Sequence, residues 1–155
     1  MTRRHPAVVT ALLAALPLLA ACAEEDRFER YCDVVRDQQD DLGRVLDADG
    51  GSAGLLPALP IFQTLEQVAP DDIADDWSIL VGRLGSLADA LEDAGVDPGS
   101  YDPVDPPDGV TEDQREAIAA GASSVATEAV REALANVTQQ ARDVCGTELV
   151  QRAGA

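Results

Sequence analysis

Residues 73–94 read IADDWSILVGRLGSLADALEDA, and this stretch decides the fold. Its large apolar residues are separated alternately by four and three positions: Ile73, Trp77, Leu80, Leu84, Leu87 and Leu91. Because an α-helix has about 3.6 residues per turn, this spacing puts them on one stripe. We therefore expect an amphipathic helix that ends at Gly95, with Trp77 in the core rather than in a ligand site.

Two earlier segments show the same period. Residues 24–47 place apolar side chains on one face, and a turn rich in Asp and Gly follows. Residues 60–68 form a shorter segment in which Pro60 suits a first helical turn. Residues 97–110 contain four prolines and two glycines, which predicts an extended loop.

The last helical segment runs from residue 112 towards Cys145. Thr111 and Gln114 resemble a capping box at its start, with Gln in place of the usual Glu. Its apolar stripe shifts by one residue midway, and we expect a bend or break at the small residues 121–124.

Four helical segments predict an all-α fold. Ala and Leu dominate the apolar residues while aromatics make up 3%, which favours helices over a sheet. We expect an antiparallel four-helix bundle in up-down-up-down order, with one short helix and a Pro-rich loop before the last helix. Residues 28–150 would form this single acidic domain.

Residues 1–21 form a candidate export signal. Arg3 and Arg4 precede an uncharged run over 7–19, which is shorter than the roughly 20 residues of a membrane-spanning helix. The arginine pair also fits a twin-arginine signal, although the apolar residues expected directly after the pair are missing.

The end of this leader, Leu19-Ala20-Ala21-Cys22, resembles the lipobox of bacterial lipoprotein precursors. The resemblance implies that the thiol of Cys22 accepts diacylglycerol and that residues 1–21 are then removed. Residues 22–27 would be anchor and tether, on the extracytoplasmic face of the cell membrane. The alternative is ordinary signal peptidase cleavage at the Ala21-Cys22-Ala23 stretch, which would release a soluble protein.

Two cysteines then remain, Cys32 and Cys145. Outside the cytoplasm disulfides persist, and the up-down-up-down order puts the start of the first helix and the end of the last at one end of the bundle. We therefore expect these two cysteines to pair. The alternative, a reactive thiol, is disfavoured because acid-rich surroundings oppose a thiolate.

The charge balance restricts the function. Eleven Arg and no Lys face 29 Asp and Glu, and without Arg3 and Arg4 nine Arg remain, a net charge of −20. Such a chain repels phosphate backbones and anionic lipids, so we expect no nucleic acid partner and attachment to the membrane through lipid alone. The single histidine, His5, lies in the leader, so we predict no enzyme activity, cofactor or zinc site.

The same topology would bring the turn after the first helix next to the 97–110 loop. We call this expected surface the acidic cap, made of Asp47, Asp49, Asp97, Asp102, Asp105 and Asp108. It could hold a divalent cation such as calcium, dock a cationic partner, or simply be solvated. Tyr101 in the loop is a candidate contact residue.

The mature part resembles the small helical lipoproteins of high-GC Gram-positive bacteria, through Tyr31-Cys32, Pro70-x-x-Ile73-x-x-x-Trp77 and Val144-Cys145. That resemblance implies architecture alone. Our leading hypothesis is a non-enzymatic envelope interaction protein with a cationic protein or ligand as partner. A small-ligand or cation-binding protein is the alternative, favoured by an apolar pocket between helices, and a carboxylate-only enzyme is a third.

Overall fold

The computed structural model describes residues 17–48 and 54–151, and side chains from Asp26 onward. Within these ranges the secondary structure is helical throughout, which confirms the predicted all-α class. The elements are α1 (Pro17–Asp47), the 3-10 turn η2 (Leu56–Ala58), α2 (Leu59–Val68), α3 (Ala74–Asp93), α4 (Glu112–Val125) and α5 (Glu128–Asp143).

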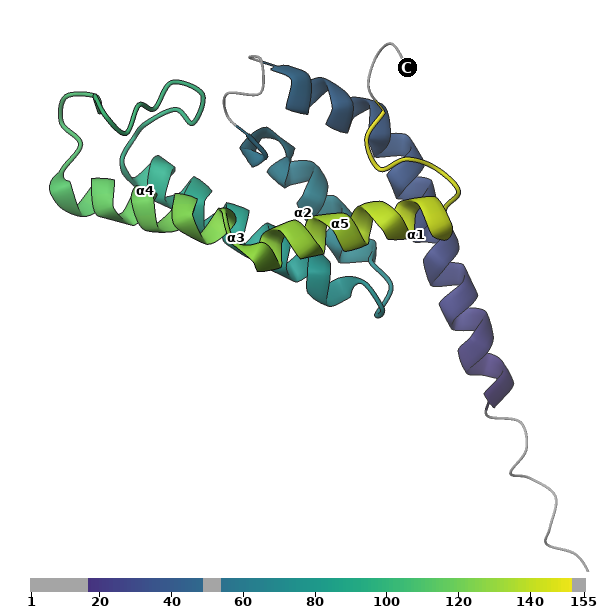
Figure 1. Cartoon of the computed structure of the whole chain (residues 1–155). Coiled ribbons are helices and arrows are strands. Elements are labelled where there is room, and N and C mark those ends of the chain that lie inside the picture. The colour runs from purple at the N-terminus through teal and green to yellow at the C-terminus, as the bar shows by residue number, and fades with distance from the viewer. Residues whose placement is uncertain (1–16, 49–53, 152–155) are drawn as a thin grey trace, which may run out of the picture.

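Helix α3 is the centre of the arrangement. It packs against α2, α4 and α5, whereas α1 contacts α2 and η2. Figure 1 shows α4 and α5 following one another along α3, with α1 crossing at the end where α5 finishes. No helix in the described ranges is long and apolar enough to cross a bilayer.

The stripe that was predicted for the central helix is its buried face. Trp77, Leu80, Leu84, Leu87 and Leu91 are all buried, and α3 departs from the predicted 73–94 by one residue at each end. Trp77 is fully buried, as predicted.

Around Trp77 lies the larger of two core clusters. The Trp77 Nε1–H donates a 3.1 Å hydrogen bond to the Tyr31 hydroxyl, and the Phe62 ring lies 5.6 Å from the Trp77 ring between centroids. Desolvation by burial raises the pKa of Tyr31 to about 12, opposed by the bond from Trp77 and helped by the charge of Asp72. Both polar groups are thus satisfied inside the core.

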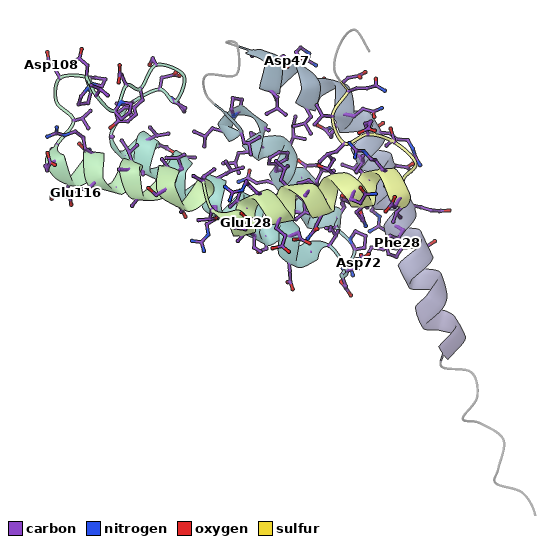
Figure 2. The ribbon with its side chains drawn as sticks, in the orientation of Figure 1. Phe28, Asp47, Asp72, Asp108, Glu116 and Glu128 are labelled. Atoms are coloured by element: carbon purple, nitrogen blue, oxygen red, sulfur yellow. A yellow bond between two sulfur atoms is a disulfide. The ribbon has the colours of Figure 1, made fainter. Side chains whose placement is uncertain are left out.

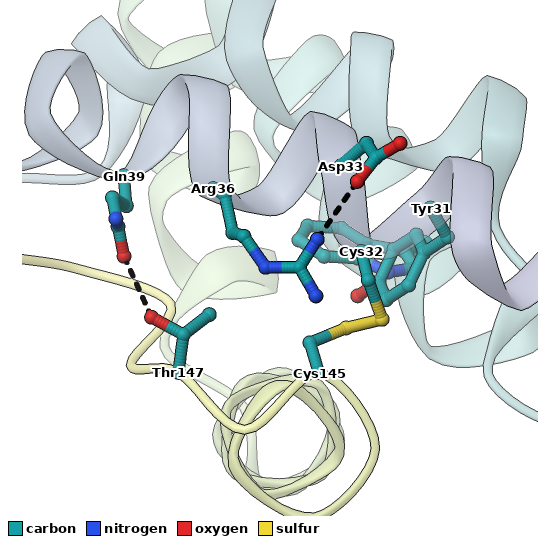
Figure 3. Close-up of a disulfide and its surroundings, with 8 residues drawn as sticks. Tyr31, Cys32, Asp33, Arg36, Gln39, Cys145 and Thr147 are labelled. Carbon is teal, nitrogen blue, oxygen red and sulfur yellow. Dashed lines mark hydrogen bonds and ion pairs between the residues drawn. A yellow bond between two sulfur atoms is a disulfide. The ribbon is translucent and has the colours of Figure 1, made fainter.

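The Cys32–Cys145 disulfide is present, with its two Cα atoms 5.0 Å apart (Figure 3). It joins α1 to the second residue after the end of α5. The chain then continues along α1, where the Thr147 hydroxyl donates to Gln39 Oε1 at 2.9 Å. The predicted pairing of the first and last helical segments is therefore confirmed.

The largest departures from the prediction are at two helix boundaries. Helix α1 begins at Pro17, seven residues before the expected start at 24. The last segment is two helices, because Thr127 is extended and acts as the N-cap of α5. The break thus falls just after the predicted 121–124, and it explains the one-residue shift of the apolar stripe.

The start of α4 follows the prediction. Thr111 Oγ1 accepts from the Gln114 amide N–H at 3.3 Å, and Gln114 Oε1 accepts from the Thr111 amide N–H at 2.9 Å. The glutamine completes the capping box as a glutamate would.

Candidate functional site

An apolar hollow of about 610 Å³ lies between the C-terminal half of α3, helix α4, the 97–110 loop and the turn before η2. We call it the groove. Leu87, Leu91 and Ile118 line it and form the second, smaller core cluster, and Leu55 and Leu56 line it from the side of η2. Its size falls within the roughly 300–1,000 Å³ of ligand pockets.

Small side chains on α4 leave this space open. At Gly121 the two helices approach so closely that a Cβ atom would lie 3.0 Å from the Cα of Leu87. Beside this contact, two of the α4 residues that line the groove, Ala119 and Ala122, are small and lie opposite the leucines of α3. Close helix approach combined with short side chains leaves the leucine floor incompletely covered.

The 97–110 loop forms another wall and is held by its own hydrogen bonds. Asp97 Oδ1 accepts from the Gly99 amide at 2.9 Å, and Asp102 Oδ1 accepts from the Val104 amide at 2.8 Å. These local turns present Tyr101 to the groove, where it is half-buried against the second cluster. The residue predicted as a contact candidate therefore lines the groove.

One further bond ties the loop ends together. Gln114 Nε2 donates at 2.8 Å to the backbone carbonyl of Asp93, the last residue of α3. The end of α3 and the beginning of α4 are therefore linked directly. This link fixes both ends of the loop that forms one wall of the groove.

The groove is apolar inside and acidic at its edge. Residues 97–116 carry seven carboxylates and one guanidinium, a net charge of −6. That guanidinium belongs to Arg115, which is ion-paired with Glu112. Glu116 also lines the groove and forms no ion pair among the described residues. The field at the groove is therefore negative.

Two residues of the predicted acidic cap, Asp47 and Asp108, lie apart. Figure 2 shows Asp108 and Glu116 at one end of the molecule, well away from Asp47 at the end of α1. The reason is length: α2 has 10 residues and α3 has 20, so the turn that precedes α2 reaches only partway along α3.

Of the six cap residues, Asp97, Asp102, Asp105 and Asp108 are exposed on the loop beside the groove, Asp47 is exposed elsewhere, and Asp49 lies outside the described residues. No group of three or more His, Cys, Asp and Glu placed to hold a metal occurs in the described part of the chain. The expected joining of the two acidic segments into one cap is therefore wrong for Asp47 and Asp108. Cation binding stays a prediction.

Comparisons with family models, with curated proteins and with solved structures found no match to this chain. The groove itself was not predicted from the sequence. The signals that could have found it are Ala119 and Ala122, since small residues facing a leucine stripe leave volume unfilled.

Proposed function

We propose that this chain is the precursor of an extracytoplasmic lipoprotein that binds a small apolar ligand in the groove without transforming it. The acyl chains on Cys22 would hold it at the outer face of the cell membrane. The helices would form a four-helix bundle in up-down-up-down order, with α4 and α5 together as the broken fourth arm.

The observation that carries the ligand-binding role is the groove. An envelope protein that acted only through its outer surface would have no use for an apolar hollow of about 610 Å³. The cluster around Trp77 is closed, whereas the cluster around Leu87 and Ile118 borders open space. Ligand binding is therefore favoured over the surface-interaction role that composition alone suggested.

The anchoring role is supported by the path of α1. The helix runs without a break from Pro17 to Asp47, and Figure 1 shows its first turns projecting away from the other helices. Cys22 precedes the disulfide-bonded Cys32 by ten residues, which is about 15 Å of helix. Lipid on Cys22 would hold the domain by its disulfide end and leave the groove at the other end.

The anchor is tested by the mass of the exported protein. We expect the wild type to begin at Cys22, to carry the added mass of diacylglycerol, and to sediment with membranes. Cys22→Ala should leave it unmodified. Cys145→Ser is the matched control, because it removes a cysteine and should keep the acylation. Recovery of an unmodified wild-type polypeptide in the soluble fraction would contradict the anchor.

A second role, docking of a cationic protein, is favoured by the four exposed aspartates of the 97–110 loop. Crosslinking in intact envelopes followed by capture of the protein would test it. Since such docking would be electrostatic, raising the salt concentration should weaken it strongly. Capture that does not change with salt would exclude this role.

A further inference from the structure

We propose that the groove binds a cationic amphiphile, with a hydrocarbon chain on the leucine floor and a positively charged group beside Glu116. The inference rests on the proposed ligand-binding role of the groove and names the chemistry of the ligand. Three observations support it: the lack of unsatisfied polar groups in the walls, the size of the hollow, and the charge at its edge.

The apolar walls of the groove favour a hydrocarbon ligand over a hydrogen-bonding one. Among the described residues the only buried side-chain polar atoms without a partner belong to Gln140 on α5, which does not line the groove. Leu87, Leu91 and Ile118 offer contact area only. A ligand would therefore gain affinity by removing its apolar surface from water, at roughly 0.8 kcal/mol per methylene.

The size of the hollow favours a small molecule over a partner helix. A helix recognised in a groove presents anchors over at least two turns. With its side chains a helix is about 10–12 Å across. The groove holds about 610 Å³ and is bordered by Tyr101 and Pro103 of the loop. An alkyl chain needs less width than a helix.

The charge at the edge selects the head group. Arg115 is already paired with Glu112, which leaves the Glu116 carboxylate as the lining charge without an ion pair in the described chain. The net charge of −6 over residues 97–116 attracts a cation and repels a carboxylate, sulfate or phosphate. The ring of Tyr101, which also lines the groove, can attract an ammonium group through a cation–π interaction.

The test uses the full chain with Cys22→Ala, so that no detergent is needed to keep an acyl chain in solution. Dodecyltrimethylammonium, dodecyl maltoside and dodecyl sulfate, each below its micelle concentration, are titrated calorimetrically. We expect one saturable site, with affinity falling from the cation to the neutral probe to the anion. Shortening the cationic chain by two carbons should weaken binding by about tenfold.

Two variants, each compared with a matched control, locate the site. Ala122→Phe should fill the groove and weaken binding by at least about tenfold, whereas Ala120→Phe, on α4 but outside the lining, should not. Glu116→Gln should lower the affinity for the cationic probe two- to fivefold, which corresponds to about 0.5–1 kcal/mol for an exposed ion pair. Glu132→Gln, at another exposed glutamate, should leave that affinity unchanged. Ala119→Phe replaces Ala122→Phe if that variant fails to unfold cooperatively.

The outcomes separate this inference from the proposed function. The inference would be overturned if wild type and Ala122→Phe bound dodecyltrimethylammonium equally well. It would also be overturned if dodecyl sulfate bound as tightly as dodecyltrimethylammonium. If the neutral or the anionic probe binds at least as tightly as the cation, and Ala122→Phe weakens that binding, the ligand-binding role stands and the cationic ligand is wrong. If no probe binds, both fail, while the anchor at Cys22 is judged separately by mass.

Discussion

Removing the Cys32–Cys145 disulfide should cost this domain a large share of its stability. The bond joins residues 113 positions apart, and the chain-entropy model gives about 5 kcal/mol for closing a loop of that length. Folding free energies of small domains are about 5–15 kcal/mol, so this is a major contribution. Because α1 packs on α2 and η2 and not extensively on α5, few other contacts would compensate.

The assay is urea unfolding followed by the fluorescence of Trp77, the single tryptophan. We compare the oxidised wild type, the reduced wild type and the Cys32→Ser/Cys145→Ser double variant. With a slope of about 2 kcal/mol per molar, a loss of about 5 kcal/mol moves the midpoint by roughly 2.5 M. The reduced protein and the double variant should unfold together.

A double variant within about 1 kcal/mol of the oxidised wild type would refute this reasoning. It would mean that α1 is held by its contacts with α2 and η2 alone. A reduced wild type that differs from the double variant would mean that the serines, rather than the open loop, cause the loss.

Two further predictions concern the interior. The Tyr31 pKa is about 12 in the fold against 10.0 ordinarily, so the free energy of unfolding should be constant with respect to this group below pH 10 and should fall by about 3 kcal/mol as the pH rises towards 12. Tyr31→Phe should remove this alkaline loss, measured as unfolding free energy against pH. At pH 7 the same variant should cost roughly 1–2 kcal/mol, because the Trp77 N–H loses its acceptor. Gly121→Val should cost about 2 kcal/mol in chemical unfolding because its Cβ meets the Leu87 backbone, whereas Gly82→Val, whose Cβ meets nothing within 4 Å, should be nearly neutral; equal losses in the two variants would contradict the close contact.

The sequence was informative wherever one local rule decided the structure. The period of the stripe from Trp77 to Leu91 predicted α3 to within one residue at each end, because a central helix buries the whole stripe. Thr111 and Gln114 predicted the start of α4 through a contact three residues apart. Assigning Cys22 to the lipid anchor left two cysteines, and this count predicted the disulfide pair.

Features that depend on the relative lengths and positions of helices were not predicted. The expected meeting of Asp47 with Asp108 failed because periodicity carries no information on how far the end of α1 lies from the 97–110 loop. The break before α5 was predicted a few residues early, at the small residues 121–124, whereas Gly121 lies within α4 and allows its close approach to Leu87. Thr127 followed by Glu128 was the overlooked start signal. The groove was missed because it arises between elements.

The acidity of the chain acquires a physical role once the anchor and the groove are considered together. An acylated Cys22 would hold the disulfide end of the domain about 15 Å of helix from the lipid, so only orientations that tip the domain towards the bilayer bring its charges within a Debye length, about 8 Å, of the head groups. Anionic head groups would repel a mature chain of −20, which favours orientations in which the domain stands away from the bilayer. The segment 97–116, with its net charge of −6, lies at the end of α3 that is remote from the disulfide and from Asp72. The repulsion would therefore keep the groove on the side of the domain that faces away from the bilayer. The same field would draw a cationic amphiphile from solution towards the groove, so that one charge distribution serves both orientation and capture.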